Sequence, residues 1–204
     1  MIINDSFPKF DLPIDFIADD SITGDILNYY SNFPCKIKAG VFVLCTEGMV
    51  KATINLLEVV IRKNDFVIVL PNSFIQIHEV SSDTRISFAG FSSDFMLSGN
   101  YVEILLDSMP MILNSPVISL QDDIAGLYRN VYLLLIRAYT LPHSLENKDI
   151  IRSILAIFLQ GTKELYKRYG RKLDEPLRRE QELYRQFIQL LMACLLYTSP
   201  SPRD

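Results

Sequence analysis

The spacing of apolar residues changes partway along the chain, and this change constrains the possible fold more than any other feature. Residues 49–56 show the two-residue alternation of a half-buried β-strand, with these side chains on one face: Val50, Ala52, Ile54 and Leu56. Residues 121–141 instead follow the helical repeat, carried by Ile124, Leu127, Tyr128, Val131, Leu134, Leu135 and Ala138. The sequence therefore predicts an α+β chain in which strands come first and helices follow.

The predicted strands lie in residues 35–95. Short β-rich runs are separated by turn-forming residues, at Glu47-Gly48, Lys63-Asn64-Asp65, Pro71-Asn72-Ser73 and Ser81-Ser82-Asp83. Roughly six strands at this spacing indicate an antiparallel sandwich or barrel. Before them, residues 1–34 contain several prolines and scattered aromatic side chains, so we expect an irregular arm that packs on the rest of the chain.

The predicted helices begin after a transition at residues 96–120, where a short helix at Val102–Ser108 is possible. Residues 121–141 and 147–169 are expected to form an antiparallel pair within a 121–170 unit, because Pro142 and Gly170 end them and their connection is short. Residues 171–193 read as a charged linker and the start of a third helix after Pro176.

Residues 194–204 form a separate case, because they resemble the in-frame translation of a transposase-end sequencing adapter. A natural tail rich in Ser and Pro is the alternative. We expect this string to be foreign, and the natural sequence to be readable only to about residue 193, inside a helical pattern. On that interpretation the chain is a piece of a longer protein.

Composition narrows the class of protein. The chain has 204 residues, of which 49% are apolar and 22% are charged, as expected for a folded protein. Its net charge of −4 argues against direct binding of DNA by its own surface. No apolar run reaches the length of a membrane span, and no signal peptide is visible. Three cysteines without CxxC spacing fit a reducing compartment, so we expect a cytoplasmic location and no membrane partner.

Residues for catalysis or metal binding are scarce in the sequence. The two histidines, His78 and His143, do not form an HxH pair, so we expect no metal, no cofactor and no catalytic residue. Cys45 is expected to be a small buried apolar residue rather than a nucleophile. These features predict a protein that is not an enzyme.

A small-molecule pocket is the sharper hypothesis for residues 74–80. If Gln76 and His78 point to the interior, they place polar groups in an apolar cavity; if Ile75 and Ile77 do, the interior is plain core. Sequence parity leaves this choice open. The candidate ligand-binding residues are Phe42, Thr53, Gln76, His78 and Ser87.

The two long helices carry more apolar surface than one sheet face needs, which favours packing on the sheet together with contact to a second copy of the chain. We therefore predict a homodimer. Its candidate contact residues are Leu127, Val131, Leu134, Ile154 and Phe158.

The order of these parts resembles the sensor half of AraC-family transcriptional regulators. The resemblance is carried by residues 33–37, 43–48 and 61–72, followed by Ile75-Gln76-Ile77, and by residues 182–192, which look like the helix that leads into that family's DNA-binding domain. It extends over about residues 30–192.

The resemblance implies a small cupin-like β-barrel that binds an effector, a helix pair that dimerises, and two helix-turn-helix motifs in a C-terminal domain absent from this chain. DNA would be contacted only through that missing domain. The effector is unknown. Two alternatives stay open: a stand-alone cupin-like small-molecule-binding protein, and a sugar-modifying enzyme.

Overall fold

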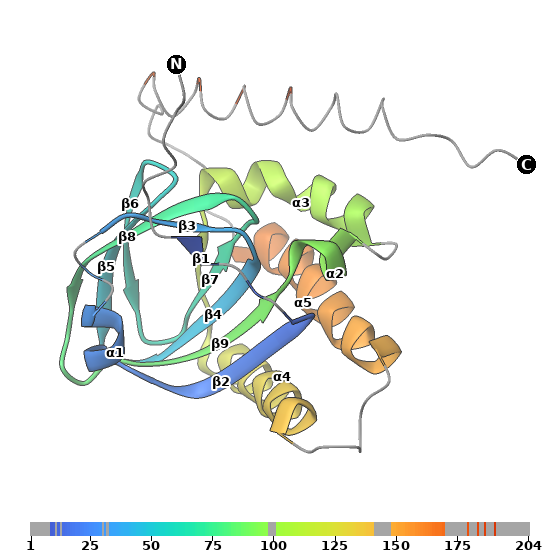
Figure 1. Ribbon diagram of the computed structural model, residues 1–204, viewed down its shortest axis with the longest axis horizontal. Coiled ribbons are helices and arrows are strands. Elements are labelled where there is room, and N and C mark those ends of the chain that lie inside the picture. The colour runs from blue at the N-terminus through green and yellow to red at the C-terminus, as the bar shows by residue number, and fades with distance from the viewer. Residues whose placement is uncertain are drawn as a thin grey trace, which may run out of the picture.

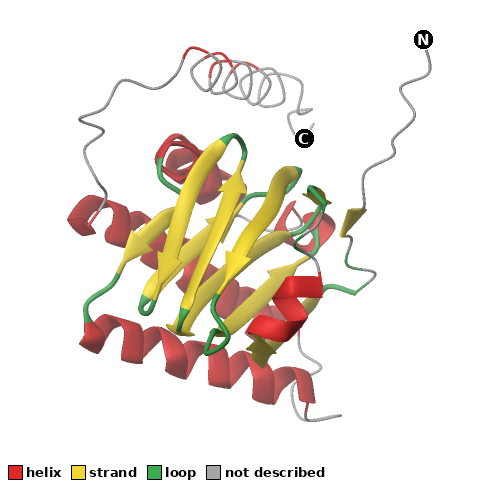
Figure 2. Ribbon diagram, turned by 90° about the vertical axis from the view of Figure 1, so that its left-hand side faces the viewer, coloured by secondary structure: helices red, strands yellow, loops and turns green. Residues whose placement is uncertain are grey.

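The computed structural model describes residues 9–10, 12, 14–29, 31, 33–97, 101–140 and 148–169, with single helical positions at Arg179, Leu183, Gln186 and Leu190. Two five-stranded sheets are stacked face to face, and the longer helices cover one side of the stack (Figures 1 and 2). The α+β class is confirmed. Of the two predicted alternatives, sandwich or barrel, the structure has the sandwich, because the two sheets share no strand and form no closed barrel among the described residues.

The first sheet has the order β1-β3-β8-β5-β6, with these bounds: β1 Lys9–Phe10, β3 Cys35–Ile37, β8 Ser73–Val80, β5 Met49–Ile54 and β6 Leu57–Arg62. The second sheet has the order β10-β7-β4-β9-β2, with these bounds: β10 Val117–Ser119, β7 Asp65–Val69, β4 Gly40–Glu47, β9 Arg85–Phe91 and β2 Phe16–Thr23. All pairings are antiparallel except that of β1 with β3.

The turns that join the strands fall where turn residues were predicted. Gly48, Asn64 and Asn72 have φ values of 77°, 67° and 67°, which glycine and asparagine tolerate better than other residues. Leu56 was expected on the buried face of a strand, and this is wrong. It lies in the two-residue turn between β5 and β6 with φ 71° and is 56% exposed.

The helices are α1 Gly24–Tyr29, α2 Ser93–Leu97, α3 Tyr101–Asn114, α4 Asp122–Thr140 and α5 Lys148–Tyr169. The two long helices confirm the predicted segments to within a residue or two. The short helix expected at Val102–Ser108 is longer than predicted, because α3 continues through Pro110 and buries Met109 and Ile112.

The segment before residue 35 is more regular than expected. Phe16–Thr23 is a strand, β2, paired along β9 at the edge of the second sheet, so the prediction of irregular chain there is wrong. The alternation is hidden in the sequence because Asp19, Asp20 and Ser21 interrupt it where β2 bulges.

Apolar side chains form two cores, one on each face of the second sheet. The core between the sheets is built from residues such as Cys45, Val50, Ala52, Val67 and Ile86. The core between the second sheet and the helices is aromatic at its centre, where the Phe42 ring stacks on Phe158 of α5 with centroids 5.0 Å apart. Because β7 serves both cores, all five of its residues are buried.

Candidate functional site

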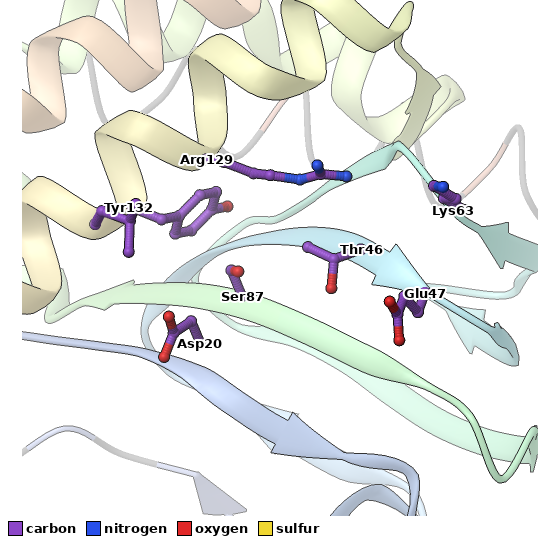
Figure 3. A pocket seen from close by; sticks show the side chains of 8 residues that line it. Asp20, Thr46, Glu47, Lys63, Ser87, Arg129 and Tyr132 are labelled. Atoms are coloured by element: carbon purple, nitrogen blue, oxygen red, sulfur yellow. The ribbon is translucent and has the colours of Figure 1, made fainter.

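A cleft of about 360 Å³ opens between the second sheet and α4 (Figure 3). We call it the α4 cleft, and its lining residues are Asp20, Thr46, Glu47, Lys63, Ser87, Arg129, Tyr132 and Leu133. They come from β2, β4, β9, the turn after β6, and α4, so the cleft exists only in the folded chain. Its volume lies at the low end of the range for small-molecule sites, about 300–1,000 Å³.

The helix-facing side of the second sheet changes from apolar to polar along its strands. On β9, Phe91 and Ala89 lie in the aromatic core, whereas Ser87 on the same face lines the cleft. On β4, Phe42 and Leu44 face the core, and Thr46 follows them at the cleft. The cleft is therefore the polar end of the same surface on which the helices pack.

Irregular strand pairing shapes the floor of the cleft. The register shifts between Cys45 and Glu47 on β4, and between Asp19 and Ile22 on β2. A bulge bends its strand and re-aims side chains, which lets the successive residues Thr46 and Glu47 both line the cleft. The Thr46 hydroxyl also donates a hydrogen bond to the Arg85 carbonyl at 3.1 Å, which fixes its position.

Tyr132 forms the inner end of the cleft. Its ring packs edge-on against Phe158 at 5.2 Å and the residue is only 1% exposed. Its Oη has no hydrogen-bond partner among the described residues, although the hydroxyl points into the cleft beside Ser87 (Figure 3). Burial raises the pKa of Tyr132 well above its usual value, so this group is a neutral donor. An unpaired buried hydroxyl costs about 1–3 kcal/mol, which a bound ligand could recover.

Arg129 and Lys63 supply the positive charge of the cleft. The Arg129 guanidinium donates to Asn64 Oδ1 at 3.2 Å, and the Asn64 amide donates to Asp122 Oδ1 at 2.5 Å. This chain of contacts ties α4 to the turn after β6 and orients the guanidinium. A guanidinium has five N–H donors, so most remain available to a ligand.

Two carboxylates supply the negative charge. Glu47 is paired with Arg85 at 3.4 Å across the β4–β9 ladder, which offsets its charge. Asp20 has no hydrogen-bond or ion-pair partner in the part of the chain that the structure describes. The cleft thus presents cations on one wall, a carboxylate on another and hydroxyl groups between them.

The described lining residues of the cleft include no cysteine and no histidine. Cys45, which directly precedes the lining residue Thr46, has a buried thiol that faces the core between the sheets. Burial and the Asp65 carboxylate raise its pKa to about 11, which keeps it a protonated thiol rather than a nucleophile. Within the described ranges, no group of three or more His, Cys, Asp or Glu side chains is placed to hold a metal ion.

The structure places the five predicted ligand-binding residues in different environments. Ser87 lines the α4 cleft, but Phe42 is buried in the aromatic core. Thr53, Gln76 and His78 lie on the outer face of the first sheet, where the Thr53 hydroxyl is hydrogen-bonded to His78 Nε2 at 2.7 Å. The structure therefore does not bring these five residues together in one cavity.

The interior of the sandwich explains this result. Ile75 and Ile77 point inward and pack on the core between the sheets, so Gln76 and His78 point away from it. At the end of the sandwich nearest α3 there is a cavity of about 10 Å³, lined by residues such as Ile54, Ile68 and Ile112. That is scarcely room for one water molecule.

The predicted dimer residues divide into two groups. Leu127 and Leu134 are 58% and 46% exposed on α4, and Val131 lies between them at heptad-like spacing, half-buried. Ile154 and Phe158 are 3% and 0% exposed, in the core of this chain. The assignment of these two to a surface for a second copy is wrong, because α5 turns this face toward the second sheet.

Of the eight lining residues, sequence reasoning named only Ser87, and the seven that it missed include Asp20, Arg129 and Tyr132. Asp20 fell in a segment expected to be irregular. Tyr132 lies within a helix that the sequence reveals by its apolar repeat, and a single tyrosine hydroxyl adds no separate signal to such a repeat. Arg129 lies three residues before Tyr132, a spacing that places both on neighbouring positions of one helix side, and this was the available sequence signal.

No protein-family model matches the chain, and no curated protein does either. None of the described helices is long and apolar enough to cross a lipid bilayer.

Several solved structures are similar at low sequence identity. The AraC-like transcriptional activator CuxR is 10% identical over 92% of this chain and 60% of its own, with a TM-score of 0.47. ToxT from Vibrio cholerae O395, solved with a naphthyl-butenoic acid ligand, is 12% identical over 91% of this chain and 73% of its own, with a TM-score of 0.42. The EutQ protein of Clostridium difficile is 14% identical over 44% of this chain and 72% of its own, with a TM-score of 0.29. Similarity this low identifies neither a family nor an activity for the chain.

Proposed function

We propose that the chain is the effector-sensing and dimerising part of an AraC-type transcriptional regulator. One observation carries the proposal: α4 holds the walls of a polar cleft on one side and an exposed leucine stripe on another. Arg129 and Tyr132 line the cleft, whereas Leu127 and Leu134, two turns apart, face solvent. A helix placed in this way can pass the occupancy of a site to a contact between subunits.

The order of the elements in the sequence supports the same function. A double sheet is followed by two long helices, and Arg179, Leu183, Gln186 and Leu190 are again helical. This is the order that the sequence resemblance implies for the sensor half of such a regulator. The net charge of −4 fits a part that leaves DNA contact to a separate basic domain.

The mechanism we propose is a shift between two populations. A ligand that fits better when α4 is held closely against the second sheet favours that arrangement and so changes the position of the leucine stripe. The Arg129–Asn64–Asp122 contacts join α4 to the β6–β7 turn at the same place. Dimer geometry then sets the spacing of the DNA-binding domains.

Sedimentation velocity tests the dimerisation step. We expect the chain to sediment as a dimer, and Leu127→Gln with Leu134→Gln to convert it to a monomer that keeps its circular dichroism spectrum. Leu56→Gln is the matched control, because Leu56 is 56% exposed against 58% for Leu127 but lies at the β5–β6 turn. A wild-type monomer, or a dimer that survives the double substitution, contradicts the proposal.

A stand-alone small-molecule-binding protein is the second candidate function. The observation in its favour is that the α4 cleft is complete within this chain and needs no DNA-binding domain to form. A sugar-modifying enzyme is less well supported, because Glu47 is paired with Arg85, which leaves Asp20 as the one unpaired carboxylate among the described lining residues. Persistent monomeric behaviour together with ligand binding would favour the binding protein.

A further inference from the structure

We infer that the α4 cleft binds a small carboxylate whose opposite end carries hydrogen-bond donors: an amino acid or a hydroxylated acid. The inference deepens the proposed function by giving the chemical class of its effector, and in that sense rests on it. The binding site itself is argued from the side chains that line the cleft.

The cationic wall selects a carboxylate. Arg129 and Lys63 both line the cleft, and Arg129 is held in place by Asn64 Oδ1 at 3.2 Å. Charge-assisted hydrogen bonds from a preoriented guanidinium to a carboxylate are among the strongest that proteins form. Lys63, which has no hydrogen-bond or ion-pair partner among the described residues, adds a second positive charge on the same wall (Figure 3).

The opposite wall selects donors. Asp20 ends the helix-facing row of β2, after Phe16 and Ala18, and its carboxylate accepts hydrogen bonds only. It lies beside Ser87 at the end of the cleft away from Lys63 (Figure 3). Either the ammonium of an amino acid or the hydroxyls of a hydroxylated acid would satisfy it.

The pairing of charges around the cleft favours a ligand with an anionic group. Glu47 is already paired with Arg85 at 3.4 Å, so two cations face one uncompensated carboxylate among the lining residues. A neutral sugar would leave the cationic wall without a counter-ion. A simple fatty acid would leave Asp20 without a donor and would expose an apolar tail to Thr46 and Ser87.

The unpaired hydroxyl of Tyr132 is a second observation, separate from the charged side chains, that indicates a ligand site in the cleft. Its Oη is buried, points into the cleft and has no partner in the described chain, whereas its ring is fixed against Phe158. A ligand atom placed between Arg129 and Ser87 would meet this hydroxyl. The cavity of about 360 Å³ has room for a molecule of amino-acid or sugar-acid size.

Isothermal titration calorimetry on the chain tests the inference with four probes: L-serine, L-glutamine, D-gluconate and D-glucuronate. Propionate, which lacks the donor end, and D-glucose, which lacks the carboxylate, are the controls. We expect at least one of the four probes to bind and both controls to fail. If none of the four binds at millimolar concentration, or if a control binds as well as the acids, the inference is overturned.

Substitutions test which side chains of the cleft bind the carboxylate end of the ligand and which bind its donor end. Arg129→Gln should weaken binding by about 10–100-fold and Tyr132→Phe by about 3–10-fold, since each removes hydrogen bonds to the ligand. Asp20→Asn distinguishes an amino acid from a hydroxylated acid. It should nearly abolish binding of an amino acid, because the ammonium group needs the negative charge, but should weaken binding of a hydroxylated acid only a few-fold. Arg137→Gln, at an exposed position of α4 about two turns beyond Arg129 and outside the cleft lining, is the matched control and should leave binding unchanged.

Ligand binding and dimerisation are measured separately, so each can fail without the other. If the acids do not bind but Leu127→Gln with Leu134→Gln still dissociates a dimer, the effector class is wrong and the sensor proposal remains. If an acid binds with the expected response to Arg129→Gln and the chain is a monomer, the binding site stands and the dimerising role falls.

Discussion

At the scale of single residues, Cys45 links the core between the sheets to the pH dependence of stability. The side chain is fully buried on β4, and its thiol donates a hydrogen bond to the Glu47 carbonyl at 3.2 Å. Burial raises the pKa of the thiol to about 11, and the Asp65 carboxylate adds to the effect. The folded state therefore keeps a proton that the unfolded chain gives up near pH 8.5–9.

We predict that the free energy of unfolding decreases as pH rises from about 9 toward about 11. In this window the unfolded state has lost the Cys45 proton and the folded state still holds it, so each pH unit favours unfolding. The full contribution is about 1–3 kcal/mol. Urea unfolding of the wild type and of Cys45→Ala at about pH 8, 9 and 10 measures it.

The variant should be less stable at about pH 8, because it leaves a small cavity, but its stability should depend less on pH up to about 10. Above that, the buried hydroxyls of Tyr128, Tyr132 and Tyr166, whose pKa values are also raised by burial, affect both proteins alike. Parallel pH profiles for the two proteins would contradict the role given to Cys45.

At the scale of elements, α4 and α5 meet where Gly161 leaves room for a tyrosine hydroxyl. Tyr128 Oη is buried without a hydrogen-bond partner among the described residues. A methyl group added at Gly161 would collide with this Oη but would lie 3.4 Å from the Tyr128 Cζ carbon, close to ordinary contact. The glycine is therefore required by one oxygen atom and not by the path of the helix.

This predicts a strongly non-additive pair of substitutions. Gly161→Ala alone should destabilise the fold by about 1–3 kcal/mol, because the clash outweighs the gain of about 1 kcal/mol in helix propensity. Tyr128→Phe alone should be neutral or stabilising, since it removes an unpaired buried hydroxyl. The double variant should be more stable than the wild type by about 1–2 kcal/mol. Additive effects in thermal or urea unfolding would show that Gly161 serves another purpose.

Most helices and strands could be located from the sequence because each has one face toward the core and one toward solvent, which produces a periodic pattern of apolar residues. Val50, Ala52 and Ile54 alternate because β5 has one face in the core and one toward solvent. It failed where tertiary contacts override local patterns. The Asp19–Ser21 bulge conceals β2, and Pro110 did not stop α3, whose turns on both sides of the proline are buried against the rest of the chain.

The candidate site was predictable only in part, for a related reason. Ser87 is the one residue of the predicted set that lines the α4 cleft. Residue parity cannot show which face of a strand meets the helices, and Gln76 and His78 lie on the outer face of the first sheet. The α4 cleft depends on two bulges and on the crossing of α4 over the second sheet. Neither feature leaves a periodic signal in the sequence.

At the scale of the whole molecule, the second sheet is shared by two cores, and α5 closes the second of them. Phe158 of α5 lies at the centre of the core between the second sheet and the helices. Its ring contacts five other aromatic rings: Phe42, Phe66, Phe91, Tyr128 and Tyr132. The helices and the second sheet thus share one continuous apolar core. Loss of this single ring should affect the whole fold.

We predict that Phe158→Ala lowers the free energy of unfolding by about 3–5 kcal/mol, with loss of tertiary structure throughout the chain if the wild type is only marginally stable. Phe74→Ala is the control, because Phe74 is 41% exposed on the outer face of the first sheet and should cost far less. Urea unfolding followed by circular dichroism measures both. A small effect of Phe158→Ala would mean that α5 is not integral to the core.

The regulator assignment is tested most directly by reading the gene at its source beyond the codon for Met192. The proposal predicts that the natural reading frame departs from residues 194–204 of this sequence and extends into a basic domain with two helix-turn-helix patterns. A stop codon within a few residues of Met192 would contradict it. The chain would then be a ligand-binding sandwich with a helix pair and no means of holding DNA.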